Sequence, residues 1–185
     1  RPSDVTKFPI IEAMLSVPRE QFVPSEARDT AYRDGPIELE TGRSLLEPRT
    51  LAKMLDALDI SRNELVLDLG CGLGYSSAVI ARMAEAVVAI EETEALATEA
   101  ETLLGAANAD NVAVLQGTLT DAAAKHGPYD VIILQGGVQE VPTSVTDQLK
   151  EHGRIAAIFM DGALGVCRIG HKTNGAVNWR DAFNA

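Results

Sequence analysis

Three glycines, each separated by one residue, are the part of this sequence with the clearest chemical meaning. They are Gly70, Gly72 and Gly74. Glycine has no Cβ atom, so the chain can turn sharply here and a ligand can approach the main chain closely. Asp68 precedes the first glycine by two residues, and Glu91 follows it by about 20 residues. This spacing is typical of a loop that binds a nucleoside, with a carboxylate that accepts hydrogen bonds from the ribose hydroxyls.

The elements around these residues place them at one edge of a sheet. Apolar runs predict a buried strand over 65–69 and a second strand over 86–90, which Glu91 directly follows. A helix is predicted over 75–84. The glycines therefore lie between a strand and a helix, at the carboxyl edge where nucleotide-like ligands bind. The start of that helix, which contains Ser76, offers free N–H groups to ligand oxygens.

Strands and helices alternate through the middle of the chain. Short apolar runs without polar alternation are typical of strands that are covered on both faces, so we expect a mostly parallel sheet flanked by helices. Near the carboxyl end, Asn174-Gly175 is a turn signal between two short strands, and this antiparallel hairpin is predicted to close one edge. The remaining expected strands are 112–115, 129–134, 154–160, 166–169 and 176–179, and the expected helices are 48–59, 94–104 (ended by Gly105), 121–125 and 142–150 (ended near Gly153).

The first 48 residues differ from the rest of the chain. They hold short apolar clusters between prolines and glycines, with helical turns expected over 10–15 and 27–32. We interpret residues 1–48 as an appendage that covers the active-site face. Residues 49–185 are interpreted as the ligand-binding domain.

Composition excludes several classes of protein. The chain has 185 residues, 46% of them hydrophobic, and a formal net charge of −11, which indicates one folded domain rather than a disordered chain. An acidic protein without a long apolar stretch is expected to bind neither nucleic acid nor a membrane. Cys71 and Cys167 form no metal-ligand or disulfide pattern, and no signal peptide is visible, so we expect no metal and a cytoplasmic setting. The oligomeric state is left open.

The position of the third glycine differs from that of a dinucleotide-binding loop. Dinucleotide loops read G-x-G-x-x-G, and Tyr75 stands where their third glycine would be. Asp68 also suits a cationic amino group better than a pyrophosphate. The combination resembles the loop and ribose acid of class I S-adenosylmethionine-dependent methyltransferases. That resemblance implies a Rossmann-like α/β fold. A nicotinamide dehydrogenase is the alternative function.

The same resemblance implies roles for two further strand ends. Thr118 and Leu119 follow the third strand, where this fold places a residue that contacts the adenine. Gln135 follows the fourth strand, at the mouth where the transferred methyl group would lie, and is expected to contact the cofactor or substrate. A structural role as a polar strand end stays open for Gln135.

A closer resemblance begins in the amino-terminal region. The run 17–24 reads Val-Pro-Arg-Glu-Gln-Phe-Val-Pro and resembles the opening of the protein-L-isoaspartate O-methyltransferases. The likeness continues through the glycine loop, 129–133 and Glu140-Val141-Pro142. It implies an enzyme that uses S-adenosylmethionine to methylate the carboxylate of isoaspartyl or D-aspartyl residues in damaged proteins or peptides.

The sequence departs from that family where the substrate carboxylate would bind. The family typically reads Gln-Thr-Ile-Ser-x-Pro after a glycine, whereas 43–48 reads Arg-Ser-Leu-Leu-Glu-Pro. Ser44 keeps a hydroxyl at the threonine position and is the catalytic candidate. Leu46 replaces the serine to which the family assigns catalysis. Arg43 either compensates by pairing with a carboxylate or pairs with Glu40 or Glu47 at the surface.

Two functional alternatives follow from these departures. One is a methyltransferase of the same fold with a changed acceptor, and the other is a catalytically degenerate S-adenosylmethionine-binding protein. Methyl transfer to an isoaspartyl carboxylate requires no catalytic histidine, because a carboxylate nucleophile is already ionised near neutral pH.

Overall fold

In a computed structural model, which describes residues 5–185, helices and strands alternate through the middle of the chain. The helices are α1 (Phe8–Ser16), α2 (Pro48–Leu58), α3 (Tyr75–Ala81), α4 (Glu94–Ala106) and α5 (Thr143–Thr146). The strands are β1 (Ile37–Glu40), β2 (Arg43–Leu45), β3 (Leu65–Leu69), β4 (Ala86–Glu91), β5 (Val112–Gln116), β6 (Tyr129–Val138), β7 (Leu149–Asp161), β8 (Leu164–Thr173) and β9 (Ala176–Asn184). Short 3-10 turns span Arg19–Phe22, Ser25–Thr30, Leu119–Asp121 and Ala124–His126.

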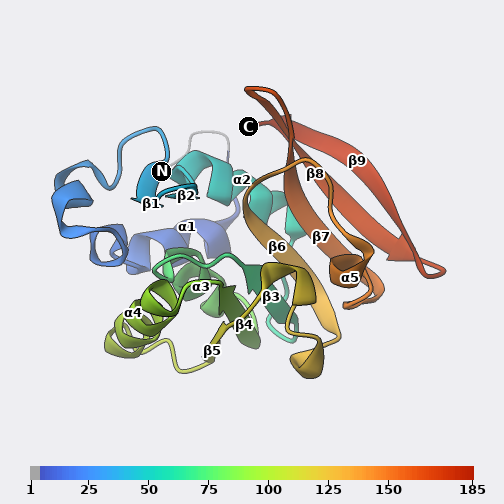
Figure 1. The fold of residues 1–185 in the computed structure, drawn as a ribbon, viewed down its shortest axis with the longest axis horizontal. Helices are drawn as coiled ribbons and strands as arrows, with labels where there is room; N and C mark the ends of the chain where they lie inside the picture. The colour runs from blue at the N-terminus through green and yellow to red at the C-terminus, as the bar shows by residue number, and fades with distance from the viewer. Residues whose placement is uncertain (1–4) are drawn as a thin grey trace.

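The main sheet has the order β5-β4-β3-β6-β7-β8-β9 (Figure 1). Strands β5, β4, β3, β6 and β7 pair in parallel, and β8 and β9 continue the sheet in antiparallel pairing. Because β3 lies between β4 and β6, the chain order reverses beside it, which makes the carboxyl end of β3 a topological switch point. The predicted α/β fold, with a mostly parallel sheet and a carboxyl-terminal hairpin, is confirmed.

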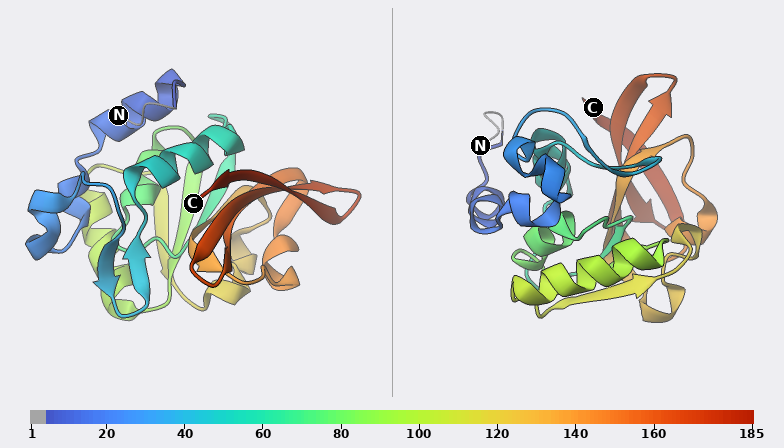
Figure 2. Two further views of the ribbon diagram at one scale, coloured as in Figure 1. Left: turned by 90° about the horizontal axis from the view of Figure 1, so that it is seen from above. Right: turned by 60° about the vertical axis from the view of Figure 1, so that its left-hand side comes forward.

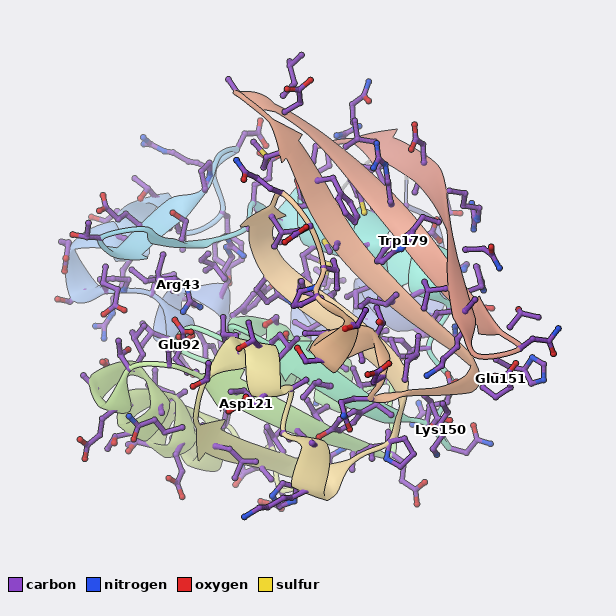
Figure 3. The ribbon with its side chains drawn as sticks, turned by 45° about the vertical axis from the view of Figure 1, so that its right-hand side comes forward. Arg43, Glu92, Asp121, Lys150, Glu151 and Trp179 are labelled. Atoms are coloured by element: carbon purple, nitrogen blue, oxygen red, sulfur yellow. The ribbon has the colours of Figure 1, made fainter. Side chains whose placement is uncertain are left out.

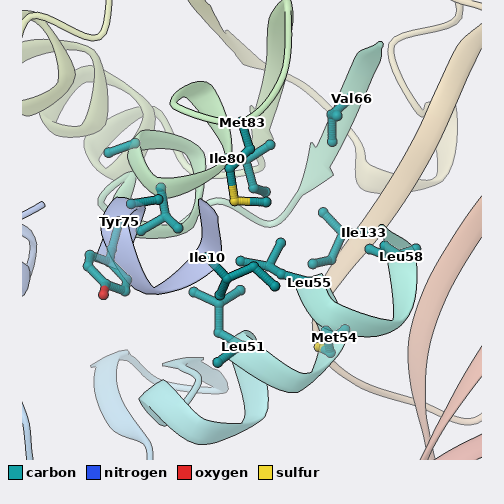
Figure 4. Packing of buried hydrophobic residues seen from close by; sticks show 14 of the residues in the cluster. Ile10, Leu51, Met54, Leu55, Leu58, Val66, Tyr75, Ile80, Met83 and Ile133 are labelled. Atoms are coloured by element: carbon teal, nitrogen blue, oxygen red, sulfur yellow. The ribbon is translucent and has the colours of Figure 1, made fainter. Parts of the chain in front are cut away.

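Alternate residues of the strands face two apolar layers. One layer joins Val66 and Ile133 of the sheet to α1, α2 and α3 (Figure 4). The helix α2 contributes the apolar stripe that its sequence spacing predicts, with Leu51 and Leu55 fully buried. On the other face of the sheet, residues such as Ile132 pack with α5 and the 3-10 turns that follow β5. These two layers hold the strand ends that carry the candidate site.

Several predicted helix boundaries were wrong. The helix α4 runs through Gly105 to Ala106, and the left-handed turn falls at Asn108, with φ of 57°. The helix predicted over 142–150 is only the four residues of α5, because the chain from Leu149 onward is drawn into β7 beside β6. The helix α3 ends at Ala81, before the predicted residue 84.

The amino-terminal segment packs onto the body of the molecule. The turns expected over 10–15 lie in α1, and the short helix expected over 27–32 is a 3-10 turn over Ser25–Thr30. Ile10 and Phe22 are buried in the same cluster as α2 and α3. Figure 2 shows this segment and the β1–β2 hairpin on one side of the molecule and the β8–β9 hairpin on the other. The division at residue 48 stays a prediction, and residues 1–4 of the proposed appendage lie outside the described part.

Within the described residues, no helix combines the length and the apolar composition that crossing a membrane requires.

Candidate active site

The glycine loop lies at the switch point and needs all three of its glycines. Gly70, Gly72 and Gly74 have φ of 80°, 59° and 102°, a left-handed backbone that side chains disfavour. The loop is fixed to the neighbouring strand, because the N–H groups of Gly70 and Cys71 both donate to the carbonyl oxygen of Ile90, at 2.9 and 3.1 Å. Gly74 is then the N-cap residue of the helix α3, which begins at Tyr75. The predicted strand, turn and helix are therefore confirmed as the frame of the loop.

Glu91, the last residue of β4, has a fully buried carboxylate beside this loop. Its Oε2 accepts a hydrogen bond from the N–H of Gly72 at 2.8 Å, and its Oε1 accepts one from the N–H of Glu92 at 2.9 Å. Two main-chain donors thus hold the carboxylate in one orientation at the carboxyl edge of the sheet. Glu91, which its spacing from the glycines predicts as a ribose acid, is thus in direct contact with the glycine loop in the fold.

Asp68 links β3, α3 and β6. One of its oxygens accepts hydrogen bonds from the hydroxyls of Ser76 and Ser77, both at 2.6 Å, and the other accepts one from Nε2 of Gln135 at 2.9 Å. Burial raises the pKa of Asp68, and these three hydrogen bonds act in the opposite direction. Asp68 therefore positions the two sides of the loop, and its expected contact with a cationic amino group stays a prediction.

The short hairpin of β1 and β2 lies over the glycine loop. Arg43 forms a bidentate ion pair with Glu91, with Nη2 2.7 Å from Oε2 and Nη1 bonded to Oε1. Figure 3 shows Arg43 between this hairpin and the strand-and-helix layer below it, close to Glu92. Burial alone would lower the pKa of Arg43, but the hydrogen bonds and charges of Glu91 and Glu92 outweigh it and raise the pKa. The expected surface pairing of Arg43 with Glu40 or Glu47 is wrong.

The hairpin also leaves no room for side chains on the loop. A Cβ atom at Gly70 would lie 2.9 Å from Nη2 of Arg43, and one at Gly72 would lie 2.5 Å from Cδ1 of Leu39. A ligand atom at either Cβ position would therefore displace the side chain beside it. Both come from the hairpin, so one movement would free both places.

The other predicted site residues line two cavities at the neighbouring strand ends. A cavity of about 480 Å³ is lined by Arg43, Ser44 and Leu46 from the hairpin side, and by Leu119 and Gln135 from the strand ends. A second cavity of about 820 Å³ is lined by Ile90, Leu115, Gln116, Gly117 and Thr118, among others. The fold therefore brings Ser44, Leu119 and Gln135 to one cavity and places Thr118 at another.

The residues present fit a ribonucleoside cofactor. They offer a buried acid for ribose hydroxyls, a glycine backbone with no side chains of its own, and two cavities at the neighbouring strand ends. Three features were not predicted from the sequence. They are the hydrogen bond from Ser77 to Asp68, the position of Leu39 over Gly72, and the ion pair of Arg43 with Glu91. Two hydroxyls in the first turn after an acidic strand end could have indicated the first. Contacts of the hairpin depend on tertiary packing and leave no local signal.

Among residues 5–185, no three His, Cys, Asp or Glu side chains are arranged to hold a metal ion. Burial, together with the charges of Asp68 and Glu91, raises the pKa of the Cys71 thiol well above its usual value, which keeps the thiol protonated.

Comparison with known proteins gives a family. The sequence profile of the protein-L-isoaspartate(D-aspartate) O-methyltransferases (PCMT) matches residues 4–182. A protein-L-isoaspartate O-methyltransferase of Pelotomaculum thermopropionicum is 36% identical over 148 residues, which cover 80% of this chain and 65% of that protein. Protein-L-isoaspartate O-methyltransferase 2 of Pelobacter propionicus is 35% identical over 166 residues, which cover 87% of this chain and 74% of that protein.

Two solved structures share the fold. A protein-L-isoaspartate O-methyltransferase superimposes with a TM-score of 0.84 at 23% identity, over 97% of this chain and 60% of that chain. A Plasmodium falciparum protein of the same description, solved in complex with S-adenosyl-L-homocysteine, also gives a TM-score of 0.84, at 20% identity, over 98% of this chain and 89% of that chain. This chain spans 65% of the length of the first relative above, so it corresponds to about two thirds of that protein.

Proposed function

Because the chain belongs to the protein-L-isoaspartate(D-aspartate) O-methyltransferase family, we propose that it binds S-adenosylmethionine at the glycine loop and methylates a carboxylate of isoaspartyl or D-aspartyl residues in proteins or peptides. The observation that carries this proposal is the buried Glu91 carboxylate, which two main-chain N–H groups hold beside Gly72. The 36% identity to a protein-L-isoaspartate O-methyltransferase supports the choice of acceptor.

Each group of residues has a part in this function. Glu91 would accept hydrogen bonds from both ribose hydroxyls, and Thr118 and Leu119 would lie near the adenine. Asp68 would hold Ser76 and Gln135 in place and balance a cationic amino group. Ser44 would donate a hydrogen bond to the acceptor carboxylate in the 480 Å³ cavity.

The chemistry is mostly alignment. S-Adenosylmethionine, when bound, would supply a methyl group whose carbon–sulfur bond breaks as a carbon–oxygen bond forms. The acceptor carboxylate is already ionised near neutral pH, so no side chain has to remove a proton. The protein then contributes by orienting the carboxylate and by excluding water with the hairpin.

Leu46 favours a second candidate, a methyltransferase with a changed acceptor. Leu46 lines the 480 Å³ cavity in which the proposed acceptor carboxylate would bind, here called the acceptor cavity, and its side chain carries no polar atom. The family resemblance places a serine at this position. Loss of one hydrogen bond to a charged group costs about 1.5–3 kcal/mol, or roughly ten- to a hundredfold in rate or affinity if nothing compensates.

Transfer of a radiolabelled methyl group from S-adenosylmethionine to an isoaspartyl peptide separates the two candidates. We expect the wild type to label this peptide, and Leu46→Ser to label it about tenfold faster because the serine hydroxyl adds a partner for the carboxylate. The same peptide with a normal aspartate is the control. If the wild type binds the cofactor and only Leu46→Ser transfers the methyl group, the acceptor of the wild type is a different one.

A further inference from the structure

Arg43 borders two parts of the site at once. Its guanidinium forms the bidentate pair with Glu91, and it also lines the 480 Å³ cavity together with Leu46 and Gln135. A Cβ atom built on Gly70 would lie 2.9 Å from Nη2 of Arg43 and 3.5 Å from the carbonyl oxygen of Gln135. The guanidinium is therefore next to the wall of the acceptor cavity while it is bonded to Glu91.

Glu91 cannot serve Arg43 and a ribose at the same time. Each of its carboxylate oxygens already accepts one main-chain hydrogen bond, from Gly72 or Glu92, and one from Arg43. Two ribose hydroxyls would need the positions that the guanidinium takes. Since the main-chain donors belong to the loop itself, Arg43 is the partner that must leave.

A displaced Arg43 requires another anion. Its side chain is only 18% exposed and its guanidinium stays protonated at all accessible pH values. The adjoining cavity is where the proposed function puts an acceptor carboxylate, and there Leu46 offers no hydrogen bond. A planar guanidinium binds a carboxylate with two parallel hydrogen bonds, so it supplies more than the missing serine would.

Building on the proposed function, we propose that Arg43 is a specificity-determining residue with two positions. In the cofactor-free protein it closes the cofactor site by pairing with Glu91. When a ribose takes Glu91, the guanidinium turns into the 480 Å³ cavity and binds the acceptor carboxylate. The cofactor therefore binds first, and the acceptor binds tightly only afterwards.

The first experiment measures cofactor affinity rather than activity. Arg43→Gln removes the charge, and Gln is the residue that the family resemblance places there. We expect this variant to bind S-adenosylhomocysteine about tenfold more tightly than the wild type in calorimetry. This gain follows if Arg43 is paired with Glu91 in about 90% of the cofactor-free wild-type molecules, because only the other molecules can then bind. Arg33→Gln, at an exposed residue, is the control for the loss of one charge and should bind like the wild type. Equal or weaker binding by Arg43→Gln would overturn the proposal.

The second experiment uses only the wild-type protein, so it does not depend on the folding of a variant. A fluorescent isoaspartyl peptide is titrated with and without saturating S-adenosylhomocysteine. We expect affinity at least about tenfold higher with S-adenosylhomocysteine present, and no such gain for a peptide whose isoaspartyl carboxyl is an amide. Equal peptide affinity under both conditions would overturn the inference.

These results separate this inference from the function on which it rests. If no protein sample binds S-adenosylhomocysteine, the proposed function itself fails. If the wild type binds it and methylates the peptide, but Arg43→Gln gains no affinity, the function holds and the role of Arg43 fails.

Discussion

At the scale of single residues, the site depends on two buried carboxylates that do different work. Each carboxylate oxygen of Glu91 accepts one main-chain hydrogen bond and one from Arg43, and Arg43 is the partner that we propose a ribose replaces. Asp68 accepts hydrogen bonds from Ser76, Ser77 and Gln135, and it thereby links β3 to α3 and β6. Both were predictable from the sequence as acids at strand ends. Their different partners were not, because these come from segments far apart in the chain.

Asp68 should make the stability of the protein depend on pH. Burial raises its pKa in the folded state above its usual value of 3.8. Its contribution to the free energy of unfolding is then fully present below that usual value and is lost as the pH rises through the folded-state pKa. We expect the wild type to lose stability relative to Asp68→Asn as the pH rises from 4 to 7, measured by urea unfolding.

The exposed Asp29→Asn is the control for the loss of one negative charge. If the difference in the free energy of unfolding between the wild type and Asp68→Asn is the same at every pH, burial does not raise the pKa of Asp68 in the folded protein.

At the scale of elements, local sequence patterns predicted what local interactions decide. The spacing of apolar residues gave α2 and the buried strand β3 correctly, and Asn174-Gly175 gave the β8–β9 turn. The hairpin of β1 and β2 was missed because its strands have only four and three residues and several are charged. The helix expected over 142–150 was too long because strand pairing with β6 competes for the chain from Leu149 onward.

The glycine loop should tolerate no methyl group at its centre. At φ of 59° an alanine costs about 1 kcal/mol of backbone strain, and the Cβ atom would also displace Leu39. We expect Gly72→Ala to weaken binding of S-adenosylhomocysteine about tenfold or more, measured by calorimetry, because the methyl group occupies the space of the ligand.

Gly175→Ala is the matched control, since Gly175 has a similar φ of 78° in the remote β8–β9 turn and no atom within 4 Å of its Cβ position. If both variants lost stability alike and neither lost affinity, close approach to the glycine loop would not be part of binding.

At the scale of the whole molecule, the site is assembled from four segments that only the complete sheet brings together. The β1–β2 hairpin, the loop after β3, the end of β4 and the strand β6 meet at one switch point. The alternation of strands and helices predicted this edge of the sheet, because carboxyl ends of parallel strands lie together. It could not predict the strand order, which depends on pairing between segments far apart in the chain. Nor could it predict the placement of the hairpin, which follows the amino-terminal segment that packs on α2 and α3.

Calorimetric titration with S-adenosylhomocysteine, in a background that lacks the Arg43 ion pair, tests the central claim most directly. The proteins compared are Arg43→Gln, the double variant Arg43→Gln/Glu91→Gln, and Arg43→Gln/Glu101→Gln, which controls for the loss of one charge at an exposed helix position. We predict that Arg43→Gln and the control bind one equivalent alike and that Arg43→Gln/Glu91→Gln binds about ten- to a hundredfold more weakly, because hydrogen bonds from ribose hydroxyls to a charged acceptor are lost. Absence of binding to Arg43→Gln, or equal binding by the double variant that lacks Glu91, would contradict the account.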